Sequence, residues 1–145
     1  MGRLERIWIK RGNGAPMDAA MSAHLVAGRG IFGNANQRGK RQVTLITAEH
    51  WSELTAKLGM PDPGMRRANL LLSAVDLRQS RGKTLRVGAL RILINGETRP
   101  CEQMEEACPG LRAALSVPWG GGAFGEVLDD GMITIGDPAS WDERT

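Results

Sequence analysis

The chain has 145 residues, of which 41% are hydrophobic and 24% charged, with a formal net charge of +3 and an isoelectric point near 9.3. This length suits one domain with a sizeable core, and the balance excludes a disordered chain and a membrane-spanning protein, because no apolar run approaches the roughly 18 residues of a spanning helix. The N-terminus shows an alternating pattern instead of a secretion signal, so we expect a cytoplasmic protein with two reduced cysteines.

Short apolar or alternating runs separated by turn residues predict a mostly β protein. In chain order, strands are expected over 4–9, 21–26, 42–46, 69–73, 84–87, 90–94, 124–128 and 132–135. Thr47 is a suitable helix N-cap and Gly59 a suitable stop, and apolar residues recur at helical spacing between them. This segment therefore predicts a helix over 48–58.

The second half of the chain adds helical segments and a turn signal. Residues 101–115 have a helical composition that is broken at Pro109-Gly110. Asp129-Asp130-Gly131, between two strands, predicts a hairpin. The many short strands together indicate a barrel or a sandwich. We expect one domain over residues 1–137, followed by a loose C-terminal tail over 138–145.

Cys101 is a candidate for chemistry. It follows Arg99-Pro100, where a strand is expected to end and a helix to begin. A thiolate is a strong nucleophile and a soft metal ligand, and both Arg99 and the helix N–H groups would lower the pKa of this thiol. The alternative is a buried cysteine that packs as a small hydrophobic residue. That structural role is the one expected of Cys108.

Other patterns argue against several classes of site. His24 and His50 have no zinc-ligand spacing with each other or with the cysteines, and the glycine clusters match no nucleotide-binding loop. With four Trp, two Phe and no Tyr, the chain has little material for base stacking, which disfavours a nucleic-acid partner. The small, scattered positive excess fits a basic pocket for a phosphate better than a nucleic-acid stripe.

Several segments together carry a family resemblance. They are Gly30-Ile31-Phe32-Gly33, residues 40–46, Arg67-Ala68-Asn69-Leu70, residues 82–88 leading to Arg99-Pro100-Cys101, and residues 130–137. Their order and spacing resemble the MOSC domain, which is named for the C-terminal domain of molybdenum-cofactor sulfurase and also occurs as small standalone bacterial proteins. The resemblance implies a mostly β, barrel-like fold with a cleft, and one cysteine that carries sulfur as a persulfide or ligates molybdenum.

The same resemblance assigns roles to individual residues. Cys101 corresponds to the family's cysteine, which makes it the catalytic residue and a possible molybdenum ligand, and Arg67 and Asn69 correspond to the Arg-x-Asn pair near the cleft. Asn34 departs from the pattern, because many relatives carry Asp after the corresponding glycine. No pyridoxal phosphate is expected, since that cofactor belongs to the separate desulfurase domain of larger sulfurases.

The residues and the resemblance lead to one hypothesis and two rivals. Molybdopterin carries a phosphate and a dithiolene-bound metal, so we expect Arg67, Arg41 and Arg99 to bind the phosphate and Cys101 to supply a thiolate. The protein would then bind molybdenum cofactor and either carry sulfur or support reduction of N-hydroxylated compounds, with a redox or sulfur-donor protein as partner. The rivals are a non-catalytic module that binds a small anion through Arg67 and Asn69, and a nucleic-acid-binding barrel.

Overall fold

The computed structural model describes residues 2–12, 14–35, 39–100 and 102–142, so the predicted site residue Cys101 lies outside the described residues. The elements of the first half are β1 (Gly2–Lys10), β2 (Met17–Ala20), β3 (Ser22–Val26), β4 (Gly30–Ile31), β5 (Val43–Thr47), α1 (Ala48–Thr55), the 3-10 helices η1 (Ala56–Leu58) and η2 (Pro63–Arg66), and β6 (Leu70–Ser73). Those of the second half are β7 (Thr84–Val87), β8 (Leu90–Glu97), α2 (Glu102–Ala107), α3 (Leu111–Ala114), β9 (Ala123–Val127), β10 (Gly131–Thr134) and β11 (Pro138–Trp141).

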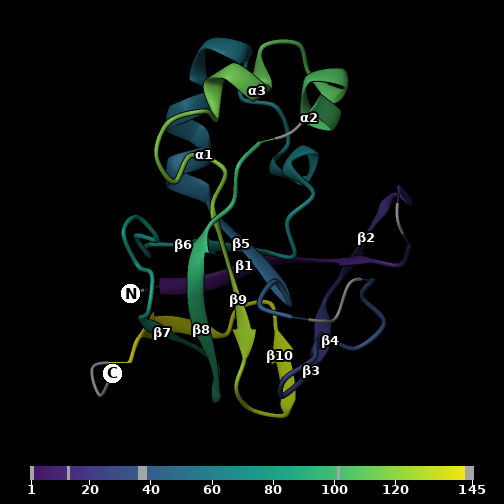
Figure 1. Ribbon diagram of the computed structural model, residues 1–145, viewed down its shortest axis with the longest axis vertical. Coiled ribbons are helices and arrows are strands. Elements are labelled where there is room, and N and C mark those ends of the chain that lie inside the picture. The colour runs from purple at the N-terminus through teal and green to yellow at the C-terminus, as the bar shows by residue number, and fades with distance from the viewer. Residues whose placement is uncertain (1, 13, 36–38, 101, 143–145) are drawn as a thin grey trace.

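Seven strands of the described chain close into a barrel (Figure 1). Their order is β11-β7-β8-β9-β5-β6-β1, and the pairing of β1 with β11 closes the ring. All neighbours in this ring are antiparallel except β5 and β6, which are parallel because the chain crosses between them through α1, η1 and η2. The prediction of a mostly β, barrel-like fold is confirmed.

The interior of the barrel is apolar. Along β8, fully buried and half-buried positions alternate, which is the period of a strand with one face on a core. A second apolar cluster lies outside the barrel, where Trp8 and Ile46 of the strands meet Trp51, Leu111 and Leu115 of the helical segments. Figure 1 shows the three α-helices gathered over this end of the barrel. No helix in the described ranges combines the length and apolar character needed to cross a membrane.

The predicted helix over 48–58 is present as α1 followed by η1. The Thr47 hydroxyl accepts a hydrogen bond from the His50 N–H at 3.3 Å, which confirms the expected N-cap. Gly59 ends the segment in a left-handed conformation with φ of 80°. The strand predicted over 90–94 is longer than expected, because β8 runs on through Asn95-Gly96 to Glu97 with a register shift against β9.

Two predictions near the C-terminus are also wrong. β10 does not form a hairpin with β9 but pairs with β3 in a separate three-stranded sheet, and the Asp129 carboxylate instead accepts hydrogen bonds from Arg91 at 2.9 Å. Residues 138–141 are not a loose tail. They form β11, which pairs with both β7 and β1 and thus closes the barrel.

Candidate functional site

A pocket of about 370 Å³ lies where the end of β1 meets the starts of β5 and β6. These three points share one edge of the barrel because β6 lies between the other two strands, antiparallel to β1 and parallel to β5. The lining residues are Lys10, Met17, Asn34, Ala35, Arg41, Gln42, Thr44, Arg67 and Asn69. The structure therefore brings together three residues of the predicted site that lie up to 28 positions apart in the sequence, Arg41, Arg67 and Asn69.

The charge of this pocket is positive. Lys10, Arg41 and Arg67 line it, and none of its lining residues in the described chain is acidic. The side chains of Lys10 and Arg41 form no hydrogen bond or ion pair with a described residue, whereas Arg67 Nη2 donates to the Ala15 carbonyl at 2.5 Å. Guanidinium and ammonium groups without counter-charges are suited to binding a phosphate or another anion.

Asn69 joins the three strands that form the pocket. Its Oδ1 accepts hydrogen bonds from the Thr44 N–H at 3.0 Å and the Thr44 hydroxyl at 3.2 Å. Its Nδ2 donates to the Trp8 carbonyl at 3.1 Å and to Asn34 Oδ1 at 3.0 Å. Both donor hydrogens and both acceptor positions of the amide are therefore used within the protein. Asn69 lines the pocket, but its side chain holds the wall together and is not free to bind a ligand.

Asn34 continues this network on the other side. It is only 9% exposed, and its Oδ1 accepts a second hydrogen bond, at 2.7 Å, from the backbone N–H of Lys10. Its Nδ2 donates to the Ala35 carbonyl at 3.0 Å. A neutral amide thus makes the contacts that a carboxylate oxygen would also make, without adding a negative charge to the pocket.

Arg67 owes its direction to an unusual backbone conformation. It follows η2 with φ of 60° and ψ of 34°, in the left-handed region that side chains other than glycine seldom adopt. The preceding turn is capped by Asp62, whose carboxylate accepts from the Gly64 N–H at 2.9 Å and from Arg6 at 2.7 Å. The hydrogen bond from Arg6 lowers the pKa of Asp62, so this cap is ionised at neutral pH.

Arg99 does not share this pocket. It lines a neighbouring pocket of about 300 Å³ with Glu97, Thr98, Pro100, Arg112 and residues 115–118. Its side chain is 85% exposed and lies 3.5 Å from the Glu97 carboxylate. Of the three arginines expected to bind one phosphate, Arg41 and Arg67 line the same pocket, and the structure separates Arg99 from them.

One carbonyl group accepts hydrogen bonds from the segment that precedes Arg67 and from the segment that carries Thr98. The Gly121 carbonyl accepts hydrogen bonds from Arg66 Nε at 2.7 Å and from the Thr98 hydroxyl at 2.5 Å. Arg66 immediately precedes Arg67, and Thr98 lines the second pocket. α2, which begins one position after Cys101, contacts η2, which ends at Arg66. The segment before Cys101 thus shares a hydrogen-bond acceptor with Arg66, and the helix after Cys101 contacts the segment that positions Arg67.

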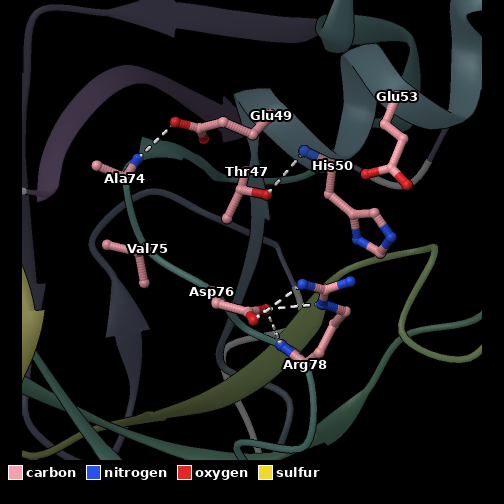
Figure 2. Close-up of a pocket in the computed structure, with 8 residues that line it drawn as sticks. All are labelled: Thr47, Glu49, His50, Glu53, Ala74, Val75, Asp76 and Arg78. Carbon is pink, nitrogen blue, oxygen red and sulfur yellow. Dashed lines mark hydrogen bonds and ion pairs between the residues drawn. The ribbon is translucent and has the colours of Figure 1, made fainter.

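A third pocket, of about 300 Å³, lies between α1 and the loop after β6 (Figure 2). Most of its polar groups are engaged, since Glu49 accepts from the Ala74 N–H at 2.7 Å and Asp76 forms two hydrogen bonds with the Arg78 guanidinium. Burial lowers the pKa of His50 below its ordinary value of 6.5, and the positive charge of Arg78 lowers it further, against the opposite effects of Glu53 and Asp76.

Sequence reasoning missed Lys10 and the structural role of Asn34. Lys10 ends β1, and nothing local distinguishes it from any other lysine at the end of a strand. The family pattern identifies Asn34 only as a departure. Its position between Lys10 and Asn69 depends on contacts across 24 and 35 positions of the chain, which no short motif reports.

Comparisons with known proteins agree with this architecture. The family model described as MOSC domain matches residues 27–140. The YuaD protein from Bacillus subtilis superposes with a TM-score of 0.81 at 21% identity, covering 96% of this chain and 94% of that one. YiiM from Geobacillus stearothermophilus gives 0.74 at 17% identity over 99% and 76% of the two chains, and YiiM from Escherichia coli gives 0.71 at 14% over 99% and 71%. No curated protein matches the chain significantly.

Proposed function

The chain belongs to the MOSC domain family, which is linked to binding of molybdenum cofactor, and from this premise we propose that it holds molybdopterin by its phosphate in the pocket of Lys10, Arg41 and Arg67. The observation that carries the proposal is the charge of this pocket, in which three cations and no acidic residue of the described chain form the lining. Phosphate oxygens are strong acceptors for such donors, and Arg offers them two parallel N–H groups.

The donor set fits one end of the cofactor. The described residues contain no cluster of three His, Cys, Asp or Glu side chains suited to a metal ion, so they supply donors for the phosphate and not a metal site. When bound, the cofactor would supply a redox-active, dithiolene-bound metal that a protein thiolate can ligate. Arg41 and Arg67 would bind and orient the phosphate, and the amides of Asn34 and Asn69 would keep the strands that carry these cations in register.

Cys101 is the residue that we assign to the sulfur chemistry, either as a ligand to molybdenum or as a carrier of persulfide sulfur. Two contacts of the described segments on either side of it support this assignment. The Thr98 hydroxyl and Arg66 share the Gly121 carbonyl, and α2, which begins at Glu102, contacts η2. In either role the function depends on the thiolate form, since the protonated thiol is a poor nucleophile and a poor ligand.

Metal and pterin analysis of the protein, purified from a host that makes the cofactor, tests this proposal. We expect molybdenum and pterin in equal amounts in the wild type, and loss of both in a variant with Arg41→Gln and Arg67→Gln. Cys101→Ala should keep the pterin and lose thiolate ligation to the metal, as well as any sulfur released by cyanide. Wild-type protein that carries neither molybdenum nor pterin under these conditions refutes the proposal.

A second candidate is a non-catalytic module that binds a small anion. The observation in its favour is that nine described residues line the pocket and three of them are cations, so binding an anion there requires no thiolate. Alkylation separates the two functions. An activated thiolate reacts with iodoacetamide well below pH 8.5, whereas an inert thiol follows the ordinary pKa of about 8.5. Cys108 is half-buried, and Cys108→Ser therefore provides the background in which the rate for Cys101 is measured.

A further inference from the structure

We infer that Asn34 makes the cationic pocket selective for doubly charged phosphate over singly charged anions of the same shape. The inference deepens the proposed function by naming the charge of the group that is bound. It depends on the pocket alone and not on a metal. The described lining residues carry three positive charges and no negative charge.

The position of Asn34 explains why this residue decides the balance. Its Oδ1 accepts from the Lys10 N–H at 2.7 Å and from Asn69 Nδ2 at 3.0 Å, two contacts that an aspartate oxygen can also make. Between Lys10, Arg41 and Arg67, an aspartate would stay ionised, because neighbouring positive charges favour the charged form. An acid at position 34 would therefore cancel one of the three positive charges and would do so from inside the wall.

Partial burial increases the effect of one charge. Asn34 is 9% exposed and Asn69 4% exposed, so the wall that carries them is shielded from bulk water. Charges interact more strongly across such a region than across solvent. With Asn34 neutral, a dianion gains more from the pocket than a monoanion does. With a carboxylate in its place, repulsion from that group offsets part of the attraction, and a dianion loses more of its binding than a monoanion does.

The test compares phenyl phosphate with phenyl sulfate by isothermal titration calorimetry. The two probes have the same ring and a tetrahedral head group, and above pH 7, where the second proton of a phosphate monoester with a pKa of about 6 is lost, they differ by one charge. For the wild type we expect phenyl phosphate to bind about tenfold more tightly or better. For Asn34→Asp the preference should fall to about twofold or less, mainly through weaker binding of phenyl phosphate. Equal binding of both probes by the wild type, an unchanged preference in the variant, or binding of neither probe overturns the inference.

A second pair of variants keeps the test valid if Asn34→Asp fails to fold, since that change replaces the hydrogen bond from Nδ2 to the Ala35 carbonyl with two facing oxygens. Met17 lines the same pocket and is half-buried, and its thioether takes part in none of the hydrogen bonds described for the pocket. Met17→Glu should abolish the preference, and the uncharged Met17→Gln should retain it. Met21→Glu places the same charge on a side chain that is 72% exposed and outside the pocket, and should leave the preference intact. A wild-type preference in Met17→Glu overturns the inference.

These results are independent of the cofactor analysis. If the phosphate preference is present and depends on Asn34, but the purified protein contains no pterin, the proposed function fails and the inference stands. If pterin and molybdenum are present but the probes bind without preference, the inference fails and the proposed function stands.

Discussion

Replacing Asn69 with alanine should destabilise the fold far more than a pocket-lining residue normally would. The change removes four hydrogen bonds, two from Thr44 to Oδ1 and two from Nδ2 to the Trp8 carbonyl and Asn34. A typical hydrogen bond contributes about 1 kcal/mol net, and a buried group left without a partner costs about 1–3 kcal/mol. Because the Thr44 hydroxyl still accepts from the backbone N–H of residue 69, and Asn34 keeps its bond from Lys10, we expect a loss of about 3 kcal/mol and not the full sum.

Urea unfolding followed by far-ultraviolet circular dichroism measures this loss. The midpoint of the Asn69→Ala variant should fall while the slope stays the same, and in a thermal melt the loss corresponds to roughly 10 °C for a chain of this length. Asn95→Ala is the matched control. The Asn95 amide donates to the Lys40 carbonyl and to Glu126, each at 2.9 Å, at the surface of the barrel where water can replace it. It should cost less than about 1 kcal/mol. If the two variants are equally stable, the argument that Asn69 holds three strands together is wrong.

Three further outcomes are expected. Arg67→Asn should keep a wild-type urea midpoint, because Asn tolerates the left-handed backbone at this position. In calorimetry, the affinity of this variant for phenyl phosphate should fall at least about tenfold, and unchanged affinity would remove Arg67 from the site. Nuclear magnetic resonance titration should give His50 a pKa below 6.5, and a pKa at or above 6.5 contradicts the burial argument. Because the unfolded chain then binds more protons than the folded one, the contribution of His50 to stability is complete above about pH 7 and declines as the pH falls through 6.5. Gly122→Ala should lower the melting temperature severely or prevent folding, because the new Cβ would lie 2.2 Å from the Leu45 carbonyl oxygen. Gly82→Ala, with a similar φ and open space around it, should cost only about 1 kcal/mol, and similar melting temperatures for the two variants would refute the steric argument.

The strands could be predicted from the sequence because their signal is local. Alternation along 84–87 and 90–94 and the turn residues between them identify β7 and β8 without reference to the rest of the chain. The pairing of β10 with β3 could not be predicted in this way, since Asp129-Asp130-Gly131 has the composition of a hairpin turn. The two aspartates instead accept hydrogen bonds from Arg91 and from the Ala27 N–H, which are 38 and 103 positions away.

The candidate site shows the same division between local and long-range information. The family resemblance pointed to Arg67 and Asn69, the need for phosphate donors pointed to Arg41, and the structure places these three around one pocket. The separation of Arg99 could not be predicted from the resemblance, because it depends on how β8 continues past Asn95-Gly96 and turns toward α2. The role of Cys101 stays a prediction, since this residue lies outside the described part of the chain.

The choice of amides over acids in the pocket wall has a physical reason. Three cations near one another repel, and the described structure offers no carboxylate in the lining to offset this repulsion. Strands that meet at such a point need connectors that bind N–H groups without neutralising the cations. The Oδ1 atoms of Asn34 and Asn69 do this, since together they accept four hydrogen bonds and carry no charge. A ligand that supplies the missing negative charge should then stabilise the fold, and a concentration of 100 times its dissociation constant corresponds to about 2.7 kcal/mol. Stability and anion binding are therefore coupled through this wall, although the residues that connect the strands are not the residues that bind the anion.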